Sequence, residues 1–316
     1  TFSVCTSTIS PTDFTAVTTA LTGGGASAVI CISAGTTAVN TGPQNTIAFT
    51  ANNQQVIGLG SGSSRPLFTS VGNTAATSGI FRTAGFTGLR LSNIRLAKAT
   101  SSSHRGAVYV DTGNLTATSI DCDGGTTAAT DGNCFKVDAT LTLSNSTLSG
   151  SSNGAAPLWT GFGSTFVGSN LTITNTVTNG GQAVFAGGDM TCTTCTATNQ
   201  DAGNATWAVQ SSVTSTIISS TLTNNTNGGC AGVLYGGYTG HFTVSNSTLS
   251  APKSGCDTVS AALMSDNGNW SITNSTIVAG TNGIAMSADA PNGTYAPHVI
   301  LNGNTFKHSN QVGGAD

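Results

Sequence analysis

The octapeptide LTLSNSTL at Leu141 to Leu148 recurs in variant forms along this chain and decides its fold. The clear copies are LRLSNIRL from Leu89, LTITNTV from Leu171, FTVSNSTL from Phe242, WSITNSTI from Trp270 and VILNGNTF from Val299. Weaker copies begin at Leu115, Met190 and Thr216. Aligned on their second apolar position, with Leu143 and Ile173 in one column, the copies lie about 26 residues apart. A period of this size predicts a solenoid, in which each unit buries its apolar face only by stacking on its neighbours.

The repeating unit is predicted to consist of strands. Apolar residues inside each copy alternate with Thr, Ser and Asn, which is the period of a half-buried strand. A second apolar stretch precedes most copies, as in GAVYV at Gly106 to Val110 and QAVFA at Gln182 to Ala186. Each turn of the solenoid should therefore hold at least two strands, with room for a third short one.

These residues resemble the right-handed parallel β-helix of the pectate-lyase-like superfamily. The wording GAVYV followed by LTLSNSTL is most similar to the polymorphic outer-membrane-protein and adhesin-type surface repeats. The resemblance covers about residues 88 to 306 and implies an all-β, single-stranded parallel β-helix. The motifs that carry it specify the fold well and the chemistry poorly.

The continuous repeat predicts one domain over residues 1–316, with an N-terminal cap at 1–27, coils at 28–306 and a tail at 307–316. A short capping helix near 11–22 is expected, with Ser10 as its N-cap and Pro11 at its first position. The tail is too short and polar to cover the last coil. We therefore expect head-to-tail self-association, a contact that does not close and that builds filaments.

The composition excludes several classes of function. Charged residues make up 7% of the chain, and its nine Lys and Arg residues cannot supply a basic surface for nucleic acid. No apolar run is long enough to span a bilayer. The first residues lack the pattern of a secretory signal, so we expect a signal to have been removed already. The expected location is extracellular or at the cell surface.

Eight cysteines, an even number, also suit an oxidising compartment. Cys5 and Cys31 lie one repeat apart, as do Cys230 and Cys256, so both pairs are predicted to form disulfides between neighbouring coils. Cys122 with Cys134 would close a loop. Cys192 and Cys195 form either a tight-turn disulfide or half of a metal site.

Nine N-x-S/T sequons occur, and their places in the repeat divide them. Asn145, Asn246 and Asn274 follow the second apolar residue, together with Asn93 and Asn175, and are predicted to form an asparagine ladder that tolerates a left-handed turn. The preferred glycosylation sites stand just before a strand, in turns expected to face solvent: Asn114, Asn170 and Asn269. The remaining candidates are Asn204, Asn224 and Asn292.

One local group of charged residues could carry chemistry. Enzymes of the resembled superfamily cleave acidic polysaccharides with clustered carboxylates, often with Ca²⁺, and an Arg or Lys base. The alignment places Lys98 one coil from Asp121 and Asp123, and Arg95 one coil from Ser119, with Asp131 and Arg105 nearby. A lyase would hold Ca²⁺ on Asp121, Asp123 and Asp131 and use Lys98 or Arg105 as its base. The alternative is salt bridging between coils.

The superfamily's hydrolase motifs are missing, and the four histidines are scattered. The main hypothesis is therefore a non-enzymatic, glycosylated, disulfide-stapled extracellular protein without a cofactor, acting as an adhesive or filament-forming unit, with glycans as further partners. The alternative is a secreted polysaccharide lyase acting on acidic glycans. A minor alternative is an ice-binding solenoid, although the short T-x-T stretches at Thr116 and Thr191 are not expected to share one register across coils.

Overall fold

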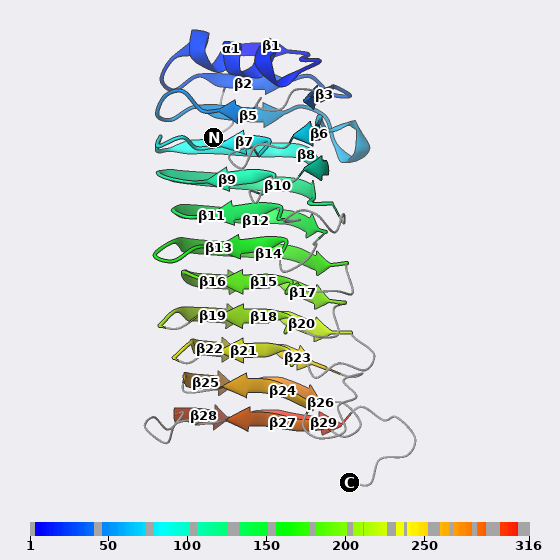
Figure 1. Cartoon of the computed structure of the whole chain (residues 1–316), viewed down its shortest axis with the longest axis vertical. Coiled ribbons are helices and arrows are strands. Elements are labelled where there is room, and N and C mark those ends of the chain that lie inside the picture. Colours follow the sequence, from blue (N-terminus) through cyan, green and yellow to red (C-terminus); the bar gives the residue numbers. More distant parts are fainter. Residues whose placement is uncertain are drawn as a thin grey trace.

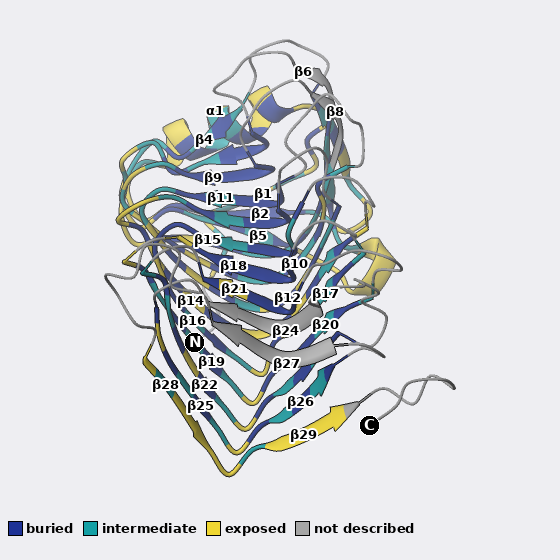
Figure 2. Cartoon of the chain, turned by 60° about the horizontal axis from the view of Figure 1, so that its bottom comes forward, coloured by how far each residue is buried: buried dark blue, intermediate teal, exposed yellow. Residues whose placement is uncertain are grey.

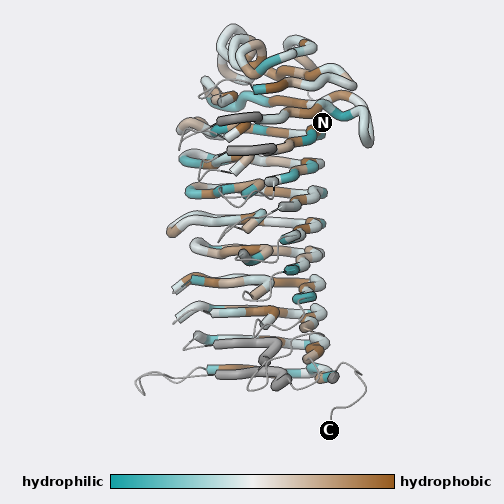
Figure 3. The backbone as a smooth tube through the Cα atoms, turned by 45° about the vertical axis from the view of Figure 1, so that its right-hand side comes forward, coloured by the Kyte–Doolittle hydropathy of each residue, from teal (hydrophilic) through white to brown (hydrophobic). Residues whose placement is uncertain are grey.

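Successive turns of the chain stack as coils of a right-handed parallel β-helix, as predicted (Figure 1). The computed structural model describes residues 4–40, 46–73, 79–101, 106–125, 133–150, 156–176, 181–200, 205–210, 212–225, 232–236, 239–251, 260–265, 268–279, 283–288 and 298–308. Figure 3 shows hydrophobic segments recurring from coil to coil. Within these described segments, the regular structure is all-β apart from one helix and one short 3-10 turn.

The larger sheet, sheet A, bends into two arms that Figure 2 shows as a V. The first arm holds β1 (Ser7–Ile9), β2 (Val29–Ile32), β5 (Gln55–Gly58), β16 (Asp189–Thr193), β19 (Thr214–Ile218), β22 (His241–Ser245), β25 (Asn269–Thr273) and β28 (His298–Asn302). The second arm holds β3 (Thr37–Asn40), β6 (Leu67–Asn73), β17 (Thr196–Asn199), β20 (Thr221–Asn224), β23 (Thr248–Ser250), β26 (Thr276–Ala279) and β29 (Thr305–His308). Four longer strands run through both arms: β8 (Leu89–Ser101), β10 (Asn114–Asp123), β12 (Thr140–Ser149) and β14 (Thr165–Asn175).

The smaller sheet, sheet B, closes the third side of each coil with mostly very short strands (Figure 2). Its members are β4 (Ile47–Ala48), β7 (Phe81–Arg82), β9 (Val108–Val110), β11 (Phe135–Val137), β13 (Leu158–Thr160), β15 (Val184–Ala186), β18 (Trp207–Val209), β21 (Leu234–Gly236), β24 (Ser260–Ser265) and β27 (Gly283–Ala288). In the strands of three residues the outer two side chains point into the core, as Phe135 and Val137 do, and the middle one points outward.

From β8 onward, one residue per coil makes the bend between the two arms, whereas longer segments join them in the first two coils. These corner residues have positive φ and follow one another in register: Asn93, Ser119, Asn145, Asn170, Thr194, Ser219, Asn246, Asn274 and Gly303. Asn and Gly adopt this left-handed conformation at a lower cost in free energy than other residues. The predicted corner asparagines are confirmed at Asn93, Asn145, Asn246 and Asn274, and Asn170 Nδ2 donates to Asn145 Oδ1 at 2.8 Å.

A buried hydroxyl follows the corner in four coils. The Ile120 N–H donates to Ser146 Oγ at 3.0 Å, and the Ser220 and Ser247 N–H groups donate to the serine hydroxyl of the next coil. Each Ser Oγ in turn donates to the carbonyl two residues before it, as Ser146 does to Ser144 at 2.7 Å. The serine hydroxyl thus replaces the backbone acceptor at the point where the corner interrupts the hydrogen-bond ladder between coils.

The register corrects the predicted alignment in one coil. Gly168 lies opposite Leu143, whereas Ile173 lies opposite Leu148 in the second arm. Asn175 is therefore not a corner residue. It begins a separate, buried ladder at the end of the second arm, where Asn175 Nδ2 donates to Asn199 Oδ1 at 2.6 Å. Asn224 continues this ladder in register with Asn199.

The same register sorts the glycosylation candidates. Asn114 and Asn269 are exposed at the starts of β10 and β25, as predicted. Asn170 is exposed but is a corner residue, so its predicted place before a strand is wrong. Asn224 is 1% exposed and its Nδ2 donates to the Gly232 carbonyl, which leaves no room for a glycan. Asn204 and Asn292 lie outside the described residues, and glycosylation at the exposed sites stays a prediction.

Three of the four predicted disulfides are present: Cys5–Cys31, Cys122–Cys134 and Cys192–Cys195. The last spans the corner at Thr194, which resolves the Cys-x-x-Cys pair as a turn disulfide. Cys122–Cys134 ties the end of the second arm to sheet B. Cys230 and Cys256 lie outside the described residues.

The helix α1 (Phe14–Gly24) covers the first coil and buries Phe14, Val17 and Leu21 against it. Its N-cap is Asp13, whose Oδ1 accepts the Ala16 N–H at 3.0 Å. The predicted Ser10 cap is wrong because β1 holds the chain extended in pairing with β2 up to Ile9.

At the other end, Leu301 and Phe306 are 41% and 50% exposed, although they lie opposite the buried Ile272 and Ile277. Head-to-tail association through this end stays a prediction. In the part of the chain that the structure describes, no helix combines the length and hydrophobicity needed to cross a membrane.

The corner column gives a stability prediction. Replacing Asn246, at φ 51°, by Ala should lower the free energy of unfolding by about 1 kcal/mol, because Ala adopts the left-handed conformation poorly. Asn246→Gly should lose clearly less, since glycine occupies the same column at Gly303. Urea unfolding of both variants measures the difference, and equal losses would contradict this role for the corner.

Candidate functional site

The charged group predicted for a lyase is not assembled as expected. Asp121 lies opposite Arg95 and Asp123 opposite Ala97, so the predicted pairing of Arg95 with Ser119 was displaced by two residues. The Asp121 carboxylate instead forms an ion pair with Arg65. Asp123 is exposed and accepts the Gly125 N–H at 2.9 Å.

The other residues of the predicted lyase site do not support such a site either. Lys98 pairs in register with Ser70 of β6, and Arg105 and Asp131 lie outside the described residues. No cluster of three metal-ligating side chains occurs among the residues that the structure describes. Bound Ca²⁺ therefore stays a prediction that the described acids do not strengthen.

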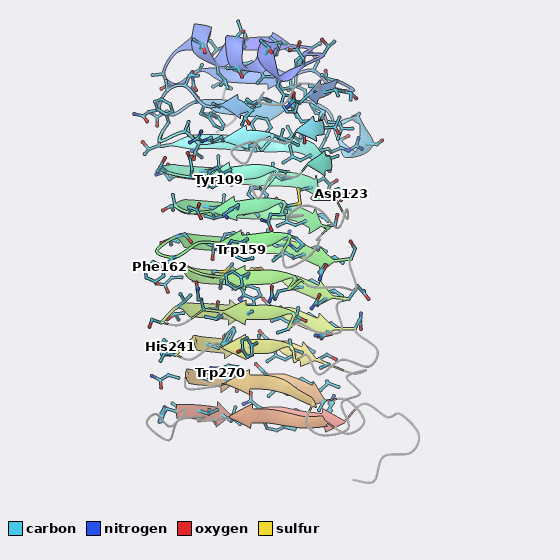
Figure 4. All side chains as sticks on the ribbon, viewed as in Figure 1. Tyr109, Asp123, Trp159, Phe162, His241 and Trp270 are labelled. Atoms are coloured by element: carbon cyan, nitrogen blue, oxygen red, sulfur yellow. A yellow bond between two sulfur atoms is a disulfide. The ribbon has the colours of Figure 1, made fainter. Side chains whose placement is uncertain are left out.

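Sheet B carries a different constellation on its outer face. The middle residues of four successive strands follow one another in register on this face: Tyr109, Lys136, Trp159 and Phe185. Tyr109 is only 7% exposed, whereas the other three are half-buried. The rings of Trp159 and Phe185 stack with centroids 4.1 Å apart, and Lys136 Nζ lies 5.8 Å from the Trp159 ring. In Figure 4, Tyr109 and Trp159 lie along one line of the solenoid, and Asp123 lies at another edge.

A carboxylate joins this column. The Tyr109 hydroxyl donates to Asp138 Oδ2 at 2.8 Å across one coil step. Asp138 follows β11 directly, so the strand that presents Lys136 also places the carboxylate. Tyr109, Lys136 and Asp138 thus bring a phenol, an ammonium and a carboxylate to one small area.

The column has an aromatic side and a gap. Phe162, in the turn that follows β13, is 83% exposed and lies three residues beyond Trp159. Below Phe185 the next outward position is Ala208, and the one after it is Tyr235, which is 38% exposed. The small Ala208 side chain between the aromatic Phe185 and Tyr235 leaves free space on this part of the face. Such a space between aromatic side chains is suited to binding a flat, partly apolar ring such as that of a sugar.

An ion pair marks the N-terminal edge of the column. Arg82, opposite Tyr109 in register, contacts Asp111 at 2.7 Å. Partial burial alone would raise the pKa of the Asp111 carboxyl. The hydrogen bonds from Thr83, Arg82 and the Ala84 N–H, with the Arg82 charge, outweigh it and hold this pKa below its ordinary value.

The tryptophans and tyrosines that could stack on sugars divide by burial. Trp207 and Trp270 are fully buried in the core, so they are excluded from that role. Trp159 and Tyr235 reach the surface of sheet B. Lys136, Asp138 and Trp159 could not be placed together from the sequence, because their shared face follows only from the register of strands three residues long.

Comparison with known proteins places the fold. No family model and no curated protein matches the sequence. Among solved structures, the A-module of the mannuronan C-5 epimerase AlgE4 from Azotobacter vinelandii is similar over 97% of this chain and 96% of its own, at a TM-score of 0.61 and 12% identity. The AlgE6 A-module from the same organism is 13% identical over 92% of this chain and 93% of its own, at a TM-score of 0.41.

A further similar structure is the tailspike protein of the Acinetobacter baumannii bacteriophage Fri1, titled a capsular polysaccharide depolymerase. It is 13% identical over 94% of this chain and 59% of its own, at a TM-score of 0.45. The likeness to the AlgE4 module establishes the parallel β-helix fold.

The likeness to the AlgE4 module overturns the conclusion that the chain is not an enzyme. That conclusion was drawn from missing hydrolase motifs, yet the AlgE4 module, which has this fold, is titled a mannuronan C-5 epimerase. Motifs of one reaction class cannot exclude the others that the same scaffold carries. The predicted closeness to adhesin-type repeats finds no counterpart among these structures.

The Asp111 ion pair predicts a dependence of stability on pH. Because its pKa is lowered in the folded state, Asp111 contributes stability above its unfolded pKa of about 3.9, and this contribution is lost as the pH falls through the folded pKa. This loss should occur roughly between pH 5 and 2. As the pH is lowered through that range, the Tm of the wild type should therefore fall more steeply than the Tm of Asp111→Asn. Asp123→Asn, at an exposed position, is the control. Parallel curves for wild type and Asp111→Asn would contradict the assignment.

Proposed function

We propose that this protein binds and modifies an acidic polysaccharide on the outer face of sheet B. The observation that carries the proposal is the gathering of Tyr109, Lys136 and Asp138 beside the stacked rings of Trp159 and Phe185. Fold likeness to a mannuronan epimerase module is consistent with this substrate class and does not by itself assign it. The acidic glycan of the lyase hypothesis is retained, and its site moves from Asp121 and Asp123 to sheet B.

Each part of the column has a use in such chemistry. The Lys136 ammonium would pair with a uronate carboxylate and stabilise the negative charge that develops when the neighbouring C–H bond is broken. The Tyr109–Asp138 pair would take the proton from that carbon: the Tyr109 oxygen would accept it while the phenol proton passes along the existing hydrogen bond to the Asp138 carboxylate. Trp159 and Phe162 offer apolar ring surface to the sugar.

Proton abstraction next to the carboxylate is the shared first step of two reactions. Return of a proton to the opposite face gives the epimer, whereas departure of the oxygen on the adjacent carbon cleaves the chain and leaves a double bond. The products distinguish them: proton NMR shows the epimer, and ultraviolet absorbance shows the unsaturated sugar.

The test uses the full chain with mannuronan and with pectate as substrates. Tyr109→Phe and Lys136→Gln should each lower kcat/KM by at least about 100-fold, in line with the loss of one acid–base or electrostatic group. Asp123→Asn is the matched control and should leave turnover unchanged, because its carboxylate lies away from sheet B. Turnover that needs Asp123 but neither Tyr109 nor Lys136 would contradict the proposed site.

A second candidate function is ice binding, and one observation favours it. Contrary to the expectation from sequence, Thr116 and Thr191 do lie in one column, on the first arm of sheet A. A longer array of Thr and Ser lies on the second arm. The outward positions of the second arm form two columns: Thr147, Thr172, Thr196, Thr221, Thr248 and Thr276 in one, and Ser149, Thr174, Thr198, Thr223, Ser250 and Val278 in the other.

The two columns form a regular array without charge. Coils in such a ladder repeat every 4.8 Å or so, and alternate residues along a strand repeat about every 6.6 Å. Hydroxyl and methyl groups at these repeats resemble the spacing of water molecules in hexagonal ice. The array is bounded by Asp121 and Asp123 at one end and by Lys307 at the other.

Thermal hysteresis and inhibition of ice recrystallisation test this candidate. If the array binds ice, Thr196→Lys should abolish both effects, because it places a hydrated charge in the middle of the array. Thr142→Lys, exposed on the first arm, is the control. A wild-type protein without either effect, or equal effects of the two substitutions, would exclude ice binding by this face.

A further inference from the structure

A pair of hollows lies on the first arm of sheet A, on a different face from the Tyr109 column. Two hollows of about 400 and 510 Å³ adjoin there, and they share Gln55, Arg90 and Thr116 as lining residues. These three residues follow one another in register on β5, β8 and β10. The Arg90 side chain is exposed and belongs to both hollows.

The first hollow is polar and is shaped by the turns before the strands. Asn53 and Asn114 line it together with Gly88. Gly88 has φ 70°, and a Cβ there would lie 2.1 Å from Asn53 Oδ1, so no other residue fits without displacing the wall. The Gly88 N–H donates to Asn114 Oδ1, which fixes the opposite wall.

The second hollow is bounded by the segment from Gly58 to Gly60, whose Leu59 is 38% exposed. Asn93 Nδ2 donates to both the Gly58 and the Gly60 carbonyls, at 2.7 and 2.9 Å. The same segment is held further along by Arg65, which donates to the Ser119 carbonyl at 2.9 Å. Hydrogen bonds thus hold in place the backbone segment that forms the wall of the second hollow.

The charge of this site favours an anion. The ion pairs found among the described residues use Arg65 with Asp121 and Arg82 with Asp111, and neither involves Arg90. The other side chains around Arg90 in the first hollow are neutral amides and hydroxyls, which suit sugar hydroxyl groups. A guanidinium binds a carboxylate through two parallel hydrogen bonds.

We infer that this pair of hollows is a subsite for a uronic acid unit, with the carboxylate on Arg90, sugar hydroxyls toward Asn53 and Thr116, and the apolar sugar face toward Leu59. The choice of ligand rests on the proposed function, whereas the site itself is separate from sheet B. Its role would be to anchor the polysaccharide at a second point, remote from the Tyr109 column.

Calorimetric titration of the full chain tests the inference, with oligomannuronate as the acidic probe and a neutral mannan oligosaccharide of equal length as the comparison. Lys136→Gln serves as the starting protein, so that binding on sheet B is weakened. In it, Arg90→Gln should weaken oligomannuronate binding at least tenfold, and Arg90→Lys should weaken it less. Thr116→Tyr, which fills the space shared by both hollows and keeps the charge, should also abolish binding.

Two results would overturn the subsite: oligomannuronate binding unchanged in Arg90→Gln, or equally tight binding of the neutral oligosaccharide. Because Arg90 and Thr116 are exposed, circular dichroism should show all variants folded.

The experiment distinguishes failure of the proposed enzyme site on sheet B from failure of the Arg90 subsite. Arg90-dependent binding without any turnover by the wild type would remove the proposed enzyme and keep the subsite, and turnover with no effect of Arg90 would do the reverse.

Discussion

The left-handed residue at the corner of sheet A is the constraint on which the rest of the structure depends. A parallel ladder continues only if each coil turns at the same place, and from β8 onward one residue of positive φ per coil makes that turn. The next residue loses its regular backbone partner, and a serine hydroxyl from the following coil replaces it. The recurring Asn-Ser-Thr is thus a structural unit: Asn bends the chain, Ser repairs the ladder and Thr returns outward. This accounts for sequons at Asn145, Asn246 and Asn274 without any glycan.

Fixed coil register has a functional consequence, because it turns single residues about 25 positions apart into continuous columns. Sheet B lines up a phenol, an ammonium and two aromatic rings. The first arm places Gln55, Arg90 and Thr116 in another line, and the second arm carries the uncharged Thr and Ser array. Each face therefore has its own chemistry on one common core. With so few charged residues in the chain, the positions of Lys136 and Arg90 carry much of the distinction between faces.

The fold could be predicted from the sequence because inward and outward residues alternate over long stretches such as Thr140–Ser149. The register could not be predicted throughout. In the coil at Thr165–Asn175 a glycine, Gly168, occupies the place of Leu143, so the apolar pattern of the second arm was aligned with the first. That displacement misplaced Asn170 and Asn175. Similar errors put Lys98 rather than Arg95 beside Asp121 and hid the Thr and Ser columns.

The candidate site was harder to predict for a related reason. A strand of three residues, such as Phe135–Val137, shows one outward residue and therefore no period. Lys136 and Trp159 could be recognised as neighbours only once the turns between them had been placed in space. The Tyr109–Asp138 hydrogen bond depends in addition on a carboxylate just beyond a strand end, which no pattern of apolar residues reports.

The most direct test of the account is a crystal structure of the protein saturated with an oligouronate. The account predicts a sugar chain along the outer face of sheet B, with one carboxylate within hydrogen-bonding distance of the Lys136 ammonium and a ring against Trp159. A bare sheet B in crystals whose ligand is bound on other faces of the solenoid would contradict it.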